Sequence, residues 1–189
     1  MKSLSRENER ILEAVWESAK PLTMKEVSEK IGLGLRPTNM RLLNLRKAGL
    51  VTESGGGYTI TAEGKAMIGF PRINEEESRK ILRKTSPEKA FHFYAGIGQS
   101  LGTSVDHLTD FCDRIRSVDI KSIEFHTARG DFESWIRHLG DIELEKRLRL
   151  IRETGLKGEV LRERLYGALR SRCDELGRKT PEGHTRRTS

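Results

Sequence analysis

Apolar residues in the first third of the chain recur at the three- and four-residue steps of an α-helix in three successive segments. The segments cover residues 5–18, 24–31 and 36–51. Because residues at this spacing lie on one face of a helix, we predict three helices that bury their apolar faces together. The residues on these faces are Ile11, Leu12, Val15 and Trp16, then Val27 and Ile31, and then Thr38, Leu42, Leu45 and Gly49.

Two short segments of alternating polarity follow the third predicted helix and flank a glycine-rich turn. Residues 49–53 lead into Ser54-Gly55-Gly56-Gly57, and residues 58–64 follow. This pattern predicts a β-hairpin, and Gly49 suits the left-handed end of the preceding helix. Since Thr61 can begin a further helix, the predicted order is three helices, a hairpin and a helix.

The face of the third predicted helix opposite its apolar stripe carries no acidic side chain. Arginine pairs with guanine and asparagine with adenine through two hydrogen bonds each, so such a face suits the major groove of DNA. An ordinary amphipathic surface helix is the alternative. The candidate DNA-contacting residues are Arg36, Thr38, Asn39, Met40, Arg41, Leu43, Asn44 and Lys47 on this helix, with Gly56 and Tyr58 in the hairpin.

Two short motifs connect the helix to the hairpin and the hairpin to the next helix. Leu45 to Val51 has the pattern L-x-x-x-G-L-V, and Thr61 to Gly64 has the pattern T-x-x-G. With these motifs, the first 70 residues resemble the winged helix-turn-helix domains of archaeal and bacterial transcription regulators. The resemblance implies that the third helix enters the major groove of double-stranded DNA and that the hairpin is the wing beside it.

Two features depart from a strongly DNA-binding winged helix. The hairpin lacks the Lys or Arg side chains that wings commonly bring to phosphates, so we expect only a weak contribution from its backbone N–H groups. Met40 and Leu43 place apolar side chains on the helix face that would meet the bases. They could contact thymine methyl groups, or they could pack against a protein of the transcription machinery.

The composition changes after Phe70. Residues 71–87 run from acidic to basic and are predicted to form a charged, partly helical linker. Residues 88–177 combine alternating segments at 90–94 and 122–126 with several helical patterns. They predict a small helix-rich α+β domain with a short antiparallel sheet. The residues expected to cap its helices are Thr103 or Ser104, Asp131 and Asp141.

The stretch from His126 to Leu148 resembles an uncharacterised domain family found mainly in archaeal proteins. The resemblance spans residues 88–177 and implies a compact domain with no established activity. His92, His126, Asp131 and His138 are candidates for a metal or acid–base site, but no recognised metal-binding or nucleophile spacing accompanies them. We therefore predict no catalytic residue, no metal and no cofactor; an enzyme tethered to a winged helix is the least favoured hypothesis.

The last helical pattern carries one apolar stripe, formed by Val160, Leu161, Leu165, Leu169, Cys173 and Leu176. Such a stripe either docks on its own domain or pairs with a second copy of the chain. Because winged-helix regulators commonly bind two half-sites, we expect a homodimer. Residues 178–189 are polar and are expected to form a disordered basic tail.

Charge and cysteine content narrow the function classes. The formal net charge is +7, and the first 70 residues contain 11 basic and 8 acidic side chains. This modest excess suits a protein that binds a site better than one that coats DNA. The sequence contains no membrane-length apolar run and no secretion signal, so we expect a cytoplasmic protein. Cys112 and Cys173 are predicted to be reduced and packed, with a redox switch as the less favoured alternative.

These observations together predict an α+β protein that regulates transcription by binding DNA. An N-terminal winged helix, residues 1–70, would bind the major groove. The C-terminal domain, residues 88–177, would serve self-association or signal sensing. A non-catalytic protein-interaction module and a general chromosome-binding protein are the alternatives.

Overall fold

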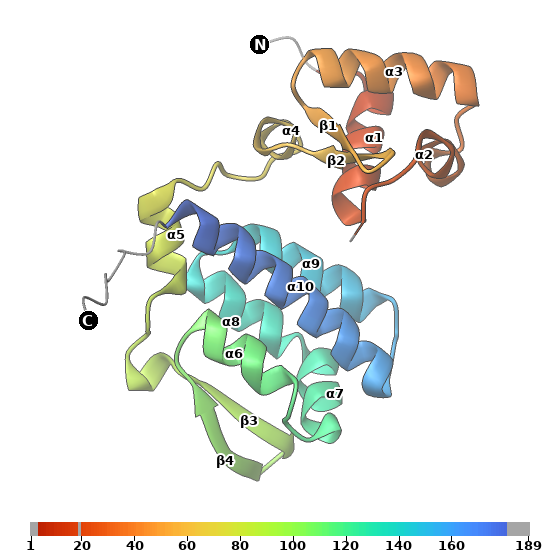
Figure 1. Ribbon diagram of the computed structural model, residues 1–189. Coiled ribbons are helices and arrows are strands. Elements are labelled where there is room, and N and C mark those ends of the chain that lie inside the picture. The colour runs from red at the N-terminus through yellow and green to blue at the C-terminus, as the bar shows by residue number, and fades with distance from the viewer. Residues whose placement is uncertain (1–3, 19, 181–189) are drawn as a thin grey trace, which may run out of the picture. The chain divides into compact units, whose positions relative to one another are not determined.

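The computed structural model describes residues 4–18 and 20–180 of the chain. The chain divides into two compact units, Met1–Arg72 and Ile73–Ser189. Figure 1 shows the two units, and each is described here by itself. Within the described residues, no helix is both long enough and apolar enough to cross a membrane.

The first unit has three helices, an antiparallel hairpin and a short fourth helix, in the predicted order. Its elements are α1 (Arg6–Glu17), α2 (Met24–Ile31), α3 (Leu35–Lys47), β1 (Val51–Ser54), β2 (Gly57–Ile60) and α4 (Ala62–Met67). Ser5 caps α1, and Thr23 and Glu26 form a reciprocal capping box at the start of α2. Leu22 pairs with Tyr58 as an isolated bridge beside the hairpin. The unit is a winged helix, as the sequence predicts.

The core of the first unit consists of the predicted apolar stripes. Ile11, Leu42 and Thr38 have no exposed surface. The Trp16 ring is also buried and lies against Phe70, with 4.6 Å between the ring centroids. The apolar faces of the three helices are thus buried inside this unit, and the opposite face of α3 is left in solvent.

The two sequence motifs of this unit meet at one backbone junction. Gly49 adopts a positive φ of 72° after α3, and its carbonyl oxygen accepts a 2.7 Å hydrogen bond from the Thr61 hydroxyl. The same hydroxyl oxygen caps α4 by accepting from the Gly64 N–H at 3.0 Å. A Cβ on Gly64 would overlap the carbonyl oxygen of Leu50, so only glycine fits where α4 passes the backbone between α3 and β1.

The second unit surrounds one two-stranded antiparallel sheet with six α-helices among its described residues. Its elements are α5 (Glu75–Leu82), the 3-10 turn η1 (Pro87–Lys89), β3 (Phe91–Gly96), β4 (Gln99–Val105), α6 (Leu108–Ile115), α7 (Ile120–Arg129), α8 (Asp131–Leu139), α9 (Ile142–Glu153) and α10 (Gly158–Lys179). The expectation of a helix-rich α+β domain with a short sheet is confirmed. The core contains Phe93, Phe111, Ile123 and Leu144.

Helix α5 lies in the segment predicted to be a linker, residues 71–87. Asn74 and Glu77 form a capping box at its start. Ile81 is buried in the core of the second unit, and α5 packs against α10. This segment therefore contributes a packed helix to the second unit, because its one apolar face is covered by α10.

Three local predictions for the second unit are wrong. Residues 122–126 belong to helix α7, whose apolar positions Ile120 and Ile123 are three residues apart, and a five-residue alternation does not exclude that spacing. Thr103 and Ser104 lie in β4, while α6 begins only at Leu108. Asp131 is the first residue of α8 and its carboxylate bonds to side chains rather than to a helix N-terminus.

The apolar stripe of α10 docks on its own unit. Leu161, Leu165, Leu169 and Leu176 are buried there, against α5, α6, α7 and α9. Val160 is an exception, because its side chain is exposed. Of the two uses that the sequence leaves open for this stripe, the structure shows docking within the chain. The predicted tail begins inside α10, and residues 181–189 of it lie outside the described residues.

Arg172 of α10 is the centre of a buried ionic network. Its guanidinium binds both carboxylate oxygens of Asp141, at 2.8 Å and 2.9 Å, and Glu143 at 2.7 Å. Asp141 also caps α9 by accepting from the Leu144 N–H at 3.0 Å, as predicted. Burial works against the charge of Arg172, but the bonds to Asp141 and the nearby Glu143 raise its pKa on balance.

We expect Arg172→Ala to lower the free energy of unfolding by about 3–5 kcal/mol, because it leaves the buried Asp141 carboxylate without its cation and removes one of the two arginines that pair with the buried Glu143. Arg170→Ala is the matched control on the same helix: its guanidinium is half-exposed and pairs with Asp174 at 3.3 Å. That variant should lose less than about 1 kcal/mol. Urea unfolding followed by circular dichroism measures both, and equal losses would contradict a central role for Arg172.

Candidate functional site

The outward face of α3 is the candidate DNA interface. Arg36, Asn39, Asn44 and Lys47 are all exposed on it. Met40, on the same face, is 59% exposed. In the part of the chain that the structure describes, the side chains of these residues make no ion pair or hydrogen bond with one another or with other residues. They are consequently available to an external partner.

Two further arginines of α3 are already engaged. The Arg41 guanidinium donates to Ser5 Oγ at 3.1 Å and to Asn8 Oδ1 at 3.2 Å, and it lies 3.5 Å from the Glu7 carboxylate. Arg46 forms an ion pair with Glu53 of β1. Arg41 therefore ties α3 to the start of α1, and Arg46 ties it to the hairpin.

Thr38 and Tyr58 require correction as candidate DNA-contacting residues. Thr38 is 0% exposed, and its hydroxyl lies 3.5 Å from the carbonyl oxygen of Leu33, within the unit. Tyr58 is 8% exposed and packs in the core, while its backbone pairs with Leu22. Both lack the surface needed to meet a groove. In the sequence, Thr38 lies at helical spacing with Leu42 and Leu45 on the apolar face of the third helix. This spacing was the signal that excludes Thr38 from the DNA-contacting residues.

The hairpin tip brings backbone rather than cations to the surface. Ser54 pairs with Gly57, so Gly55 and Gly56 form a two-residue turn, and both have positive φ. Gly57 lies so close to Pro21 that a Cβ on Gly57 would come within 2.9 Å of the Pro21 backbone. Leu43, the remaining candidate, is half-buried. Gly56 is exposed, and the candidate interface therefore relies on α3 for its positive charge.

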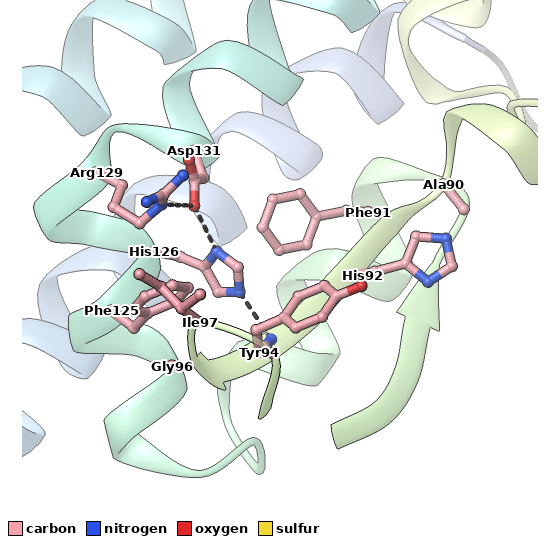
Figure 2. A pocket seen from close by; sticks show the side chains of 11 residues that line it. Ala90, Phe91, His92, Tyr94, Gly96, Ile97, Phe125, His126, Arg129 and Asp131 are labelled. Carbon is pink, nitrogen blue, oxygen red and sulfur yellow. Dashed lines mark hydrogen bonds and ion pairs between the residues drawn. The ribbon is translucent and has the colours of Figure 1, made fainter. Parts of the chain in front are cut away.

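A second candidate site is an open pocket of about 490 Å³ in the second unit. Figure 2 shows its lining side chains, which come from β3, the turn after it, and the facing parts of α7 and α8. His92, His126 and Asp131, three of the four residues predicted as a metal or acid–base cluster, line this pocket, while His138 does not. His138 is an exposed residue of α8.

His126 lies in the wall of this pocket and connects β3 to the start of α8 through its two ring nitrogens. It is 4% exposed and lies among Phe91, Phe125 and Phe132. Its Nε2 accepts a 2.9 Å hydrogen bond from the Tyr94 N–H, so Nδ1 carries the proton and donates it to Asp131 at 2.8 Å. Figure 2 shows this chain of hydrogen bonds continuing to Arg129.

The protonation state of His126 follows from this geometry. Burial lowers its pKa, and the hydrogen bond to the Asp131 carboxylate raises it by less. His126 is thus held as one neutral tautomer with both nitrogens occupied. It has no free nitrogen with which to bind a metal or accept a substrate proton.

A separate group of side chains has metal-ligand spacing in the described residues, unlike the residues of the pocket. Asp106, His107 and Asp110 offer ligand atoms within 4.8 Å of one another. The Asp106 carboxylate already bonds to His107 Nδ1 at 2.5 Å and lies 3.4 Å from Lys84 Nζ. The group also lies at the start of α6, where the helix dipole is positive and opposes a cation. Its existing partners explain it without a metal.

Comparisons with known proteins agree with this division of the chain. Residues 8–52 match the family of winged helix-turn-helix DNA-binding domains, and residues 71–170 match a family of unknown function, DUF5752. No curated protein and no solved structure matches the chain. The family of the second unit has no assigned function, whereas that of the first supports DNA binding.

We expect His126→Phe to lower the free energy of unfolding at pH 7 by about 1–3 kcal/mol, because it leaves the Tyr94 N–H without its acceptor and Asp131 with Arg129 alone. In the wild-type chain, the lowered pKa makes the unfolded state bind a proton first as pH falls below 6.5, which reduces stability there. The stability gap between the two proteins should therefore shrink toward low pH. Urea unfolding across about pH 5–8 tests this expectation, and a constant or widening gap would contradict it.

Proposed function

We propose that this chain, which belongs to the family of unknown function DUF5752 and begins with a winged helix-turn-helix DNA-binding domain, is a sequence-specific transcription regulator. The observation that carries the proposal is the outward face of α3. It contains two amides and two cations that are exposed and without partners among the described residues, and it contains no acid. Buried Thr38, Leu42 and Leu45 hold the opposite face in the core.

Each exposed residue of α3 has a role in this proposal. Asn39 and Asn44 would read adenine edges, and Arg36 would read guanine. Lys47 would neutralise a phosphate, and Met40 would meet a thymine methyl group. Arg41 and Arg46 act as positioning residues, because their side chains fix α3 to α1 and to the hairpin.

The second unit would support this function through self-association or signal sensing. A homodimer would bind two half-sites and double a modest basic footprint. Its interface cannot be the apolar stripe of α10, because most of that stripe is buried inside the unit. The His126 geometry favours a non-enzymatic role for the unit. As a regulator of transcription, the protein would act in the cytoplasm, and it needs no cofactor for this role.

Two alternatives remain, and one has a specific observation behind it. Met40 is 59% exposed on the candidate DNA face of α3, and the half-buried Leu43 lies on the same face. Apolar side chains on this face suit a partner protein of the transcription machinery. A general chromosome-binding protein is the other alternative, and it would bind all duplexes with the same affinity and a steep dependence on salt.

Substitutions on α3 separate base contacts from phosphate contacts. We expect Asn39→Ala to weaken binding to a duplex enriched by in vitro selection about 10- to 100-fold, while affinity for a scrambled duplex stays unchanged. We expect Lys47→Ala to weaken both by a similar factor and to reduce the salt slope by about one. Fluorescence anisotropy of the full chain across a salt series measures all of these.

The control is Lys121→Ala, which removes the same charge from an exposed position in the second unit. It should leave both affinities near those of the wild type. Equal losses on both duplexes for Asn39→Ala would overturn its role as a base contact. If selection enriches no sequence while binding stays salt-dependent, the chromosome-binding alternative replaces the proposal, and no binding at all favours the protein-partner alternative.

A further inference from the structure

The only two cysteines of the chain lie side by side in the second unit. Cys112 belongs to α6 and Cys173 to α10, two helices that pack against each other. Figure 1 shows α6 and α10 as neighbours, although they are far apart in the sequence. Neither cysteine belongs to a metal-ligand cluster of the described residues. The pair therefore needs an explanation of its own.

The two cysteines meet at the contact between α6 and α10. Cys173 Sγ lies 3.9 Å from the carbonyl oxygen of Leu108, which is one helical turn before Cys112 on the same side of α6. Each thiol shifts the pKa of the other: the interaction lowers the pKa of Cys112 and raises that of Cys173, because one S–H stabilises the first thiolate of the pair.

The two cysteines differ in access to solvent. Cys112 is 1% exposed and belongs to the core, whereas Cys173 is half-buried and packs on the edge of that core. A small reagent in solution would therefore meet Cys173 first, so access sets the order of attack and not the lower pKa, which belongs to Cys112. Cys112 is placed to react only with what is already attached to Cys173, which is the arrangement of a resolving cysteine.

We propose that Cys112 and Cys173 are a thiol modification site that forms a reversible intramolecular disulfide with low-molecular-weight disulfides. The proposal rests on the contact between α6 and α10 and does not depend on DNA binding by the first unit. It adds a redox-dependent covalent link to a domain family without an assigned activity.

The reaction proceeds in two exchange steps. The Cys173 thiolate attacks one sulfur of the small disulfide, which forms a mixed disulfide and releases one small thiolate that takes up the proton lost by Cys173. The Cys112 thiolate then attacks Cys173 Sγ, which forms the protein disulfide and releases the second small thiolate with the Cys112 proton. Two protein thiols are oxidised and one small disulfide is reduced to two thiols.

The link would fix α10 to α6. Helix α10 also packs against α5, α7 and α9, so the disulfide would restrain the element that most of the second unit shares. A cross-link between residues this far apart in the sequence stabilises mainly by restricting the unfolded chain. We expect the oxidised protein to melt about 5–15 °C higher than the reduced protein, for the transition of this unit.

The experiment treats the reduced full-length chain with oxidised glutathione in redox buffers and follows its intact mass without reductant. The expected product has lost two hydrogen masses, carries no glutathione, stays monomeric on non-reducing gels and no longer reacts with iodoacetamide. The melting temperature should rise, and dithiothreitol should reverse every change. Three results would each overturn the proposal: a lasting glutathione adduct on the wild-type chain, a covalent dimer, or thiols that stay unreacted in the most oxidising buffer.

Single substitutions assign the order of the two steps. Cys112→Ala should stop at a glutathione adduct on Cys173, because the resolving thiol is gone. Cys173→Ser changes the half-exposed cysteine, so it should fold, and it should resist glutathione because Cys112 is buried. Neither variant should show the rise in melting temperature. An adduct on Cys173→Ser that forms as fast as on the wild type would overturn the assignment of Cys173 as the first thiol attacked.

Discussion

The second unit depends on one buried cation. Arg172 and Asp141 are almost entirely removed from water, and a guanidinium and a carboxylate tolerate this only when they pair with good geometry. The Asp141 carboxylate accepts hydrogen bonds from the Arg172 guanidinium on both oxygens, and it also caps α9. One carboxylate thus joins the start of α9 to α10. Because an unpaired charge in this position would be costly, the network allows little variation in how α9 and α10 pack.

Similar ion pairs extend this arrangement along α8 and α9. Arg152 of α9 binds the buried Glu133 of α8 at 2.7 Å, and Arg137 of α8 binds the buried Glu145 of α9 at 2.9 Å. These pairs hold α8, whose first residue is Asp131, and Asp131 in turn holds His126 at the pocket wall. The position of His126 at this wall is therefore linked, through Asp131 and α8, to ion pairs elsewhere in the unit.

The sequence predicts well what depends on near neighbours in the chain. The α3 stripe and the glycine turn of the hairpin are local signals, and both are present. The sequence fails where the partner is distant: Arg172 lies 31 residues from Asp141, and no spacing rule connects them. For the same reason, the sequence does not predict that Arg41 of α3 bonds to Asn8 at the start of α1.

Helix α4 passes the backbone at Leu50, which follows α3, without leaving room at Gly64 for the first carbon atom of a side chain. No choice of rotamer can relieve this overlap, because a Cβ is fixed by the backbone and its nearest obstacle is the carbonyl oxygen of Leu50. The side chains of Asn39 and Asn44 make no hydrogen bond within the described chain, so an exchange there would alter the outward face of α3 and leave this junction intact. A side chain at Gly64 would instead displace Leu50, so the freedom to vary the face of α3 ends at the junction that follows the helix.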